Sequence, residues 1–293
     1  MKLSLPALTE MKTRGEPIVM ITAYDHPSAQ IVDRAGVDLV LVGDSAANTV
    51  LGHDPISTVG ATMDELAMLT AAVARGCERA LVIGDLPFMS YQVSNEETVR
   101  NAGRFVKDAG ADAVKLEGAG QSVQRVAGIV AAGIPVMGHV GLTPQTATML
   151  GGHRAQGREW QKAKKVFDDA VALETAGCFA IVLECVPEPV AAAITNRLRI
   201  PTIGIGSGAA TDGQVLVLHD ALGMRPGAHE PKFVKRFAEV GEAMEAGVHR
   251  YAGEVRARAY PAPEHTFAIS PEELAAFETA VGVGAEQNIL ADW

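Results

Sequence analysis

The sequence contains few cysteines and no long apolar run. Its three cysteines, Cys77, Cys178 and Cys185, form no C-x-x-C pair. An odd number of thiols is typical of a reducing compartment rather than of a disulfide framework. No apolar stretch approaches the roughly 20 residues that a membrane span requires, and the first residues lack the continuous apolar segment of a signal peptide. We therefore expect a cytoplasmic protein without a membrane partner.

Basic residues are also scarce: 25 Lys and Arg stand against 35 Asp and Glu, which gives a net charge of −10 with neutral His. The nearest approach to a basic cluster is Lys162, Lys164 and Lys165, whose spacing is typical of the solvated face of a helix. We therefore expect small-molecule substrates and no nucleic-acid partner. Hydrophobic residues make up 48% of the 293 residues, which excludes disorder and is enough for one large α/β domain.

Eight short runs of apolar and β-branched residues recur along the chain, with helical patterns between them. The predicted strands are residues 18–22, 38–42, 80–84, 112–117, 134–138, 179–184, 201–205 and 215–218. Runs such as DLVLV and FAIVLE alternate little, as expected for parallel strands that are covered on both faces. The pattern predicts an α/β fold, a (β/α)8 TIM barrel whose active site lies at the C-terminal ends of its strands. A doubly wound open sheet is the alternative.

The barrel domain is expected to span residues 1–265, and a C-terminal helical extension is expected to span residues 266–293. Near the end of the barrel, i, i+3, i+4 spacing predicts a long amphipathic helix that packs rather than catalyses. Its apolar positions are Phe233, Phe237, Val240, Met244, Val248 and Tyr251. In the extension, Ser270 is a predicted N-cap and Pro271 the first residue of a short helix.

Two connections, residues 46–63 and 142–158, are unusually long and rich in Gly, Thr and His. Loops of this length in a compact domain are typical of lids or binding loops, and flexible insertions are the alternative. A third segment, GIGSG at residues 204–208, follows a predicted strand. It suits either a phosphate-binding loop or only a tight turn.

Polar side chains collect where the predicted strands end. They are Asp44, Ser45, Asp85, Lys115, Glu117, His139 and Glu184. Taken singly, each residue has a structural explanation. An Asp or Ser after a strand often caps a helix, and Lys115 and Glu117 could form a buried ion pair. His139 could be a core histidine whose hydrogen bonds are satisfied. Taken together they indicate a functional site, because burying so many ionisable groups in one barrel mouth is costly without a metal or a substrate.

Three carboxylates in this set, Asp44, Asp85 and Glu117, are hard oxygen ligands that suit Mg²⁺ better than zinc. A magnesium ion with open coordination positions can chelate a 2-oxo acid and stabilise an enolate formed next to its ketone. Lys115 and His139 would then neutralise or hydrogen-bond the oxygens of the substrate.

A base must remove the carbon-bound proton in such a reaction. Glu184 is the candidate, because it lies in the apolar stretch AIVLECV and a desolvated carboxylate suits this role. Cys185 is the alternative reactive group. Strand alternation, however, places its side chain on the opposite face of the strand, away from the barrel mouth.

A set of motifs follows the chain in this order: ITAYD (21–25), LVGDS (41–45), GH (52–53), DLPFMSY (85–91), VKLEG (114–118), GHVGLTPQ (138–145), LGGHRAQGR (150–158), LECVP (183–187), IGIGSG (203–208), TDGQVLVLHD (211–220) and EHTF (264–267). In these motifs the chain resembles the family of 3-methyl-2-oxobutanoate hydroxymethyltransferases, also called ketopantoate hydroxymethyltransferases. The family is similar in fold to the phosphoenolpyruvate mutase and isocitrate lyase barrels.

The resemblance implies a reaction in pantothenate and coenzyme A biosynthesis. 5,10-Methylenetetrahydrofolate, the co-substrate, donates a one-carbon unit to 3-methyl-2-oxobutanoate, and 2-dehydropantoate and tetrahydrofolate are formed. It also implies a homodecamer built from two pentameric rings. The implied roles are Mg²⁺ binding by Asp44, Asp85 and Glu117, substrate contacts by Asp44, Ser45, Asp85, Lys115 and His139, and proton removal by Glu184.

The chain departs from the family pattern in two places. The residues after GDS are Ala46, Ala47 and Asn48, where the family has bulkier side chains. Residues 268–293 extend past the usual end of the family and are expected to pack on a subunit surface; the apolar positions there are Leu274, Phe277 and Ile289.

Two other functions remain as alternatives. One is a related Mg²⁺-dependent lyase or mutase of 2-oxo acids, which would need no folate. The K-K-C-G-H lid motif of such lyases is absent from the sequence. The other is a non-catalytic protein that binds an oxo acid, which would need no base such as Glu184.

Overall fold

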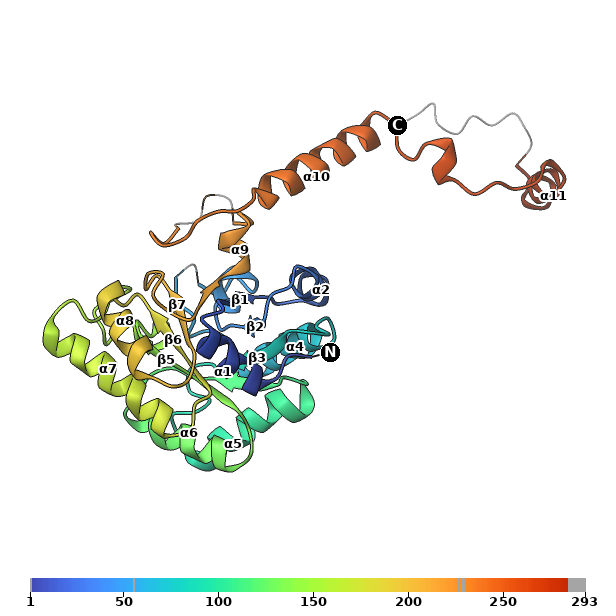
Figure 1. Cartoon of the computed structure of the whole chain (residues 1–293). Coiled ribbons are helices and arrows are strands. Elements are labelled where there is room, and N and C mark those ends of the chain that lie inside the picture. Colours follow the sequence, from blue (N-terminus) through green and yellow to red (C-terminus); the bar gives the residue numbers. More distant parts are fainter. Residues whose placement is uncertain (1, 55, 226, 228–229, 284–293) are drawn as a thin grey trace. The chain divides into compact units, whose positions relative to one another are not determined.

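The computed structural model describes residues 2–54, 56–225, 227 and 230–283, and in them eight parallel strands close into a barrel in chain order (Figure 1). The strands are β1 (Ile18–Thr22), β2 (Leu39–Val42), β3 (Leu81–Asp85), β4 (Ala113–Lys115), β5 (Val136–Gly141), β6 (Ala180–Glu184), β7 (Thr202–Ile205) and β8 (Gly213–Leu216). All eight predicted strands are confirmed, with small shifts at their ends. Because β1 pairs with β8 in parallel, the open-sheet alternative is wrong.

The helices lie mainly on the outside of the barrel, where α2 and α4 to α8 cover the strands (Figure 1). Their bounds are α1 (Leu5–Arg14), α2 (His26–Arg34), α3 (Ala46–Thr49), α4 (Met63–Ala74), α5 (Asn95–Gly103), α6 (Gln121–Ala131), α7 (Trp160–Thr175), α8 (Glu188–Arg197), α9 (Leu218–Ala221), α10 (Val240–Arg256) and α11 (Pro271–Val281). A π-helical turn, Arg104–Asp108, continues α5, and short 3₁₀ turns lie at Pro144–Thr146 and Pro263–His265. Residues 206–212 join β7 to β8 without a helix, so the β/α repeat is incomplete there.

The first helix, α1, packs into the N-terminal end of the barrel. Its Leu8 and Met11 are buried in one cluster with the inward side chains of the strands. The Ser4 side chain caps its start and Gly15, at φ 65°, ends it. These are ordinary helix start and stop signals, although the strand-based prediction did not include this helix.

Strand alternation decides which side chains enter the barrel. In β2, Leu39 and Leu41 belong to the inner cluster, whereas Val40 and Val42 pack in the layer between strands and helices. In β3 the inward positions are Leu81 and Ile83, and the next position of the same parity is Asp85. The same alternation brings Lys115, His139 and Glu184 inward at the ends of β4, β5 and β6.

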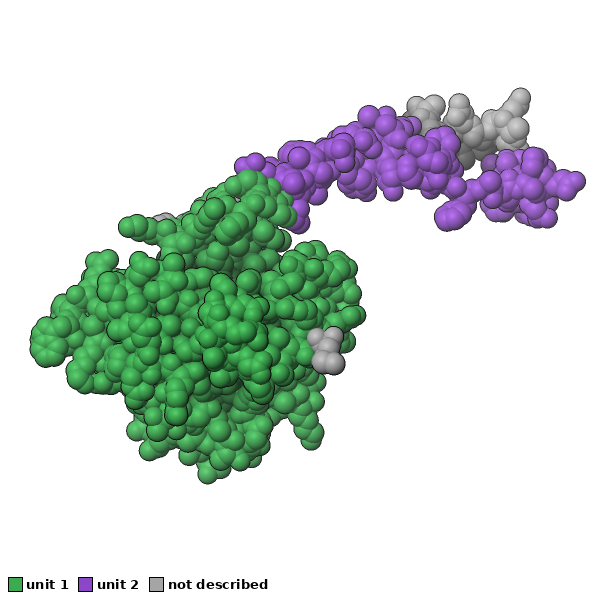
Figure 2. All heavy atoms as spheres, viewed as in Figure 1, with its two compact units in different colours: residues 1–241 green, residues 242–293 purple. Residues whose placement is uncertain are grey.

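The described chain forms two compact units, residues 1–241 and 242–293 (Figure 2). The predicted division into a barrel domain of residues 1–265 and an extension of residues 266–293 stays a prediction. The helix expected from Phe233 onward begins only at Val240, so that part of the prediction is wrong. The backbone N–H groups of Phe237 and Val240 donate to the carbonyls of Ala221 and Leu222 at the end of α9. These N–H groups are therefore not available for hydrogen bonds within a helix that starts at Phe233.

The predicted short helix of the extension is confirmed as α11, with Ser270 as its N-cap and a hydrogen bond from Glu273 N to the Ser270 side chain. Leu274 and Phe277 are exposed, and Ile289 lies outside the described residues. The packing role of the extension on a subunit surface therefore stays a prediction. None of the helices in the described residues is long and apolar enough to cross a bilayer.

Candidate active site at the carboxyl ends of the strands

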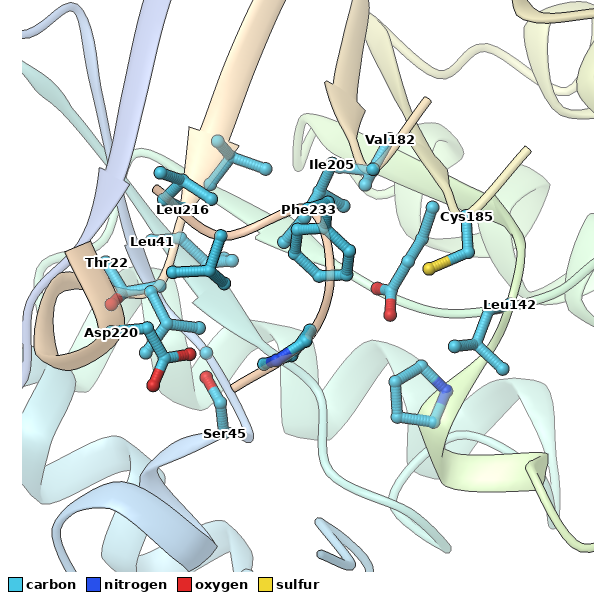
Figure 3. A pocket seen from close by; sticks show the side chains of 18 of the residues that line it. Thr22, Leu41, Ser45, Leu142, Val182, Cys185, Ile205, Leu216, Asp220 and Phe233 are labelled. Carbon is cyan, nitrogen blue, oxygen red and sulfur yellow. The ribbon is translucent and has the colours of Figure 1, made fainter. Parts of the chain in front are cut away.

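The carboxyl ends of the strands open into a cavity of about 1580 Å³. This exceeds the roughly 300–1,000 Å³ of an ordinary ligand pocket. Figure 3 shows Ser45, Cys185 and Phe233 around it, with Ile205 and Leu216 among the apolar side chains. All seven residues expected at the site line this cavity: Asp44, Ser45, Asp85, Lys115, Glu117, His139 and Glu184.

Lys115 is the centre of a buried ion network. Its Nζ lies 2.9 Å from Asp85 Oδ1 and 3.9 Å from Glu117 Oε1. Asp85 and Lys115 are register partners on β3 and β4, so the barrel holds these two side chains against each other. The expected ion pair of Lys115 therefore exists, but its closer partner is Asp85 rather than Glu117. Burial lowers the pKa of Lys115, yet the carboxylates around it outweigh this and raise its pKa overall, which keeps the ammonium charged.

His139 links this network to Glu184. Its Nδ1 lies 3.4 Å from Glu117 Oε1, and its Nε2 lies 3.2 Å from Glu184 Oε2. Burial and Lys115 lower the pKa of His139, but Glu117 and Glu184 raise it more, to about 9. The raised pKa favours the protonated ring, and its two nitrogens lie at ion-pair distance from the two carboxylates. The interpretation as a satisfied core histidine is wrong, because Nε2 is buried without a hydrogen-bond partner among the described residues.

Asp44 and Asp85 are buried carboxyl groups whose pKa values are both raised. Burial, together with repulsion from Asp85 and Glu117, raises the pKa of Asp44 to about 8. Burial also raises the pKa of Asp85, although Lys115 opposes the shift. Asp85 Oδ2 accepts a hydrogen bond of 3.0 Å from Asp44 N. A cation bound nearby would favour the ionised form of both carboxyl groups and lower their pKa values.

The donor set fits a hard cation held by two carboxylates. Asp44 Oδ2 accepts from Gln145 Nε2 at 3.0 Å, and Asp44 Oδ1 has no hydrogen-bond partner among the described residues. Both oxygens of Glu117 are engaged, one with His139 and one with Gln145 N. Across the described ranges, no three His, Cys, Asp or Glu side chains are arranged to hold a metal by themselves. The expected ligands Asp44, Asp85 and Glu117 are therefore not brought together as three metal ligands in the described residues, and Mg²⁺ binding there stays a prediction.

Ser45 is oriented by a tyrosine that sequence reasoning assigned no role. Tyr24 Oη lies 2.7 Å from Ser45 Oγ, and burial raises the pKa of Tyr24 to about 12, so the phenol stays neutral. Ser45 precedes α3 but its side chain forms no cap hydrogen bond. Asp44 and Asp85 are likewise engaged within the site, and the helix-cap explanation is wrong for these three residues.

Cys185 lies in the cavity wall next to Glu184, contrary to the expectation from strand alternation. The strand β6 ends at Glu184, and Cys185 adopts φ 50°, so the two-residue period stops there and the side chain turns toward the cavity (Figure 3). Burial and the neighbouring Glu184 raise the pKa of Cys185 to about 12. Because the reactive form is the thiolate, this thiol is a poor nucleophile even though it reaches the site.

The segment 204–208 contains the end of β7 and a bend at residues 206–207. The Oγ of Ser207 donates to Leu183 O at 2.7 Å and accepts from Val186 N at 3.1 Å. It therefore fastens the end of β7 to the loop after β6. Gly206 has φ 65°, and a Cβ there would lie 2.7 Å from the ring of Phe233, so glycine is required for that close approach.

Both long loops line the cavity. The first contributes Asn48, Thr49, Ile56 and Thr58, and the second contributes Leu142, Pro144, His153, Ala155 and Arg158. Within the second loop, Gln145 contacts Asp44 and Tyr91. Both residues lie in motifs of the family resemblance, but their roles do not follow from the sequence, because loop conformation has no period from which side-chain direction follows.

Comparison with known proteins agrees with this geometry. The family model described as "Ketopantoate hydroxymethyltransferase" matches residues 2–263. The chain belongs to this family. It is 52% identical over 273 residues to 3-methyl-2-oxobutanoate hydroxymethyltransferase of Carboxydothermus hydrogenoformans, covering 93% of this chain and 98% of that one. It is 54% identical over 266 residues to the enzyme of the same name from Moorella thermoacetica, covering 91% and 98%. The chain is thus an enzyme of the hydroxymethyltransferase family.

Solved structures share the fold at low sequence identity. A phosphonopyruvate hydrolase aligns with a TM-score of 0.59 and 14% identity, over 98% of this chain and 99% of that one. A complex of phosphonopyruvate hydrolase with oxalate and Mg²⁺ aligns with a TM-score of 0.58 and 13% identity, over 96% and 98%. These likenesses show the barrel fold, in agreement with the resemblance to mutase and lyase barrels.

Proposed function

We propose that the chain transfers a hydroxymethyl group from 5,10-methylenetetrahydrofolate to 3-methyl-2-oxobutanoate. The C3–H proton of the oxo acid is removed, C3 bonds to the folate methylene carbon, and both C–N bonds of that carbon break. Water supplies the hydroxyl of 2-dehydropantoate, and tetrahydrofolate takes up the two protons. The observation that carries the proposal is the placement of Glu184 in the same cavity as the Asp44–Asp85 pair and Lys115.

Asp44 and Asp85 would hold Mg²⁺, and Glu117 would be a third ligand, directly or through a water molecule. When bound, the cation supplies positive charge that stabilises the negative charge developing on the oxygens of the oxo acid. The raised pKa of Asp44, about 8, supports this assignment because it marks a carboxylate that needs a positive neighbour. The structural relative that contains oxalate and Mg²⁺ has the same fold.

The other residues bind the oxo acid and move its proton. Lys115, held charged by its carboxylate neighbours, supplies positive charge to the substrate oxygens, and Ser45, oriented by Tyr24, supplies a hydroxyl. Glu184 takes the C3 proton. His139 holds one oxygen of Glu184 through the contact of 3.2 Å and leaves the other oxygen for the substrate.

The rest of the cavity would take the folate. A small oxo acid fills little of the 1580 Å³. Apolar side chains such as Ile205, Leu216 and Phe233 line the space beyond the acidic site, and the basic side chains Arg158, Arg225 and Lys232 also lie on its wall. Their charges suit the carboxylates of a glutamate tail.

A product assay separates this proposal from the alternatives. The purified chain with Mg²⁺ and 3-methyl-2-oxobutanoate is followed by proton NMR, with and without methylenetetrahydrofolate, and with EDTA as a control. Formation of 2-dehydropantoate that requires both folate and metal supports the proposal. Turnover of the oxo acid without folate would favour the lyase or mutase, and binding without turnover would favour a non-catalytic oxo-acid protein.

The family also supports assembly as a homodecamer. Ten copies of the 30.7 kDa chain would have a mass of about 307 kDa. Light scattering coupled to size-exclusion chromatography measures this mass directly, and a monomer or dimer at micromolar concentration would contradict the assembly.

A further inference from the structure

Gln145 occupies an unusual position for a loop side chain. It lies in the 3₁₀ turn Pro144–Thr146 after β5 and is only 4% exposed. Its Nε2 donates to Asp44 Oδ2 and to Leu86 O, each at 3.0 Å, and its backbone N donates to Glu117 Oε2 at 3.1 Å. One residue thus contacts groups that follow β2, β3 and β4.

Tyr91 fixes the direction of the Gln145 amide. Tyr91 Oη accepts from Glu117 N at 3.3 Å and donates its single proton to Gln145 Oε1 at 2.6 Å. The amide nitrogen must then face Asp44 and Leu86. A flipped amide would set its oxygen against the Leu86 carbonyl, which cannot donate a hydrogen bond. The hydrogen bonds therefore determine a single orientation.

Resting on the proposed function, we propose that Gln145 is a positioning residue for the cation site and that Tyr91 locks it in place. The side-chain amide holds Oδ2 of Asp44, which leaves Oδ1 for the cation. The backbone N–H of Gln145 restrains Glu117 at the same time. The second long loop thereby contributes to metal binding without touching the metal.

Packing alone does not account for this arrangement. Every polar atom of the Gln145 side chain is paired, and its partners at Asp44 and Leu86 are buried carboxylate and carbonyl oxygens. An apolar residue of the same size would fill the volume but would leave those oxygens without these donors. Partners that hold a metal ligand in place typically change metal affinity or activity by about 10–100-fold when they are replaced.

The test measures the Mn²⁺ dissociation constant, by titration followed with EPR, in the absence of both substrates. Gln145→Met preserves the volume and is expected to weaken Mn²⁺ binding by about 10–100-fold. Tyr91→Phe leaves Gln145 in place but removes the hydroxyl that orients its amide and accepts from Glu117 N, and a smaller loss, roughly threefold to tenfold, is expected. Gln156→Met is the matched control in the same loop. Among the described residues the Gln156 side chain donates to Arg154 O, and the backbone bond from Gln156 N to Cys185 O is kept in the variant, so it is expected to bind like the wild type.

The outcomes separate the two proposals. A fraction of unfolded chain lowers the number of binding sites, whereas loss of positioning raises the dissociation constant itself. Wild-type affinity in folded Gln145→Met overturns the positioning role alone. Failure of the wild-type chain to bind Mn²⁺ overturns the cation site and the positioning role together. If Gln145→Met does not fold, Tyr91→Phe decides, and unchanged affinity in that variant overturns the proposal.

Discussion

The pair Lys115–Asp85 offers the sharpest test of the electrostatics of the site. Lys115→Met keeps most of the side-chain volume and removes the charge. Both side chains of the pair are at most 4% exposed, and Nζ lies 2.9 Å from Oδ1. The substitution would leave Asp85 buried with the Asp44 N–H as its remaining partner.

The magnitude follows from burial. Removing one partner of a buried ion pair costs about 3–5 kcal/mol, because the other charge remains desolvated. For a chain of this size, 1 kcal/mol corresponds to roughly 2–4 °C in melting temperature. The loss therefore corresponds to a melting temperature lower by about 6–20 °C. The double variant Lys115→Met, Asp85→Asn is expected to be more stable than Lys115→Met alone, since no unpaired carboxylate is left.

Urea unfolding of metal-free protein at one protein concentration measures these differences. The control is Lys162→Met, since Lys162 pairs with Glu159 at 3.1 Å but both side chains are more than 60% exposed. An exposed pair of this kind contributes at most about 1 kcal/mol. If Lys115→Met were no more destabilising than Lys162→Met, the account of a desolvated ion network at the barrel mouth would be wrong.

Two further predictions follow from the same site. The folded-state pKa values of His139 and Asp44 are raised, to about 9 and about 8, so the folded chain binds more protons than the unfolded chain and its metal-free stability falls as pH rises. The contribution of His139 to the free energy of unfolding is complete below about pH 6.5 and is lost as the pH rises to about 9. Urea unfolding of His139→Gln should therefore show a weaker dependence of stability on pH between these values. An unchanged dependence would contradict a raised pKa of His139. Cys185→Ser is expected to keep kcat/KM within about threefold, because the Cys185 thiol of the wild type stays protonated and takes no part in the reaction. A hundredfold loss in the product assay would indicate that Cys185 is a reactive group.

Much of the site follows from the two-residue period of strands. Asp85, Lys115, His139 and Glu184 stand at inward positions at the ends of successive strands, so the barrel prediction was enough to bring them together. The same rule was wrong for Cys185, because β6 ends one residue earlier and the backbone turns to φ 50°.

Loop residues could not be placed in this way. The roles of Gln145, Tyr91 and Tyr24 depend on hydrogen bonds between segments far apart in the sequence, and no local pattern encodes those partners. The helix expected from Phe233 also has the right apolar spacing, but the backbone of that segment bonds to the end of α9 instead. Tertiary hydrogen bonds thus override local periodicity at both places.

The most direct measurement is the rate of C3 proton exchange of 3-methyl-2-oxobutanoate in D₂O with Mg²⁺, for the wild type, Glu184→Gln and the surface control Glu159→Gln. The account predicts that Glu184→Gln slows exchange by about 10²–10⁴-fold while Mg²⁺ and oxo-acid binding persist, and that Glu159→Gln exchanges like the wild type. Exchange by Glu184→Gln at the wild-type rate would show that another group removes the proton and would contradict the assignment of Glu184 as the base.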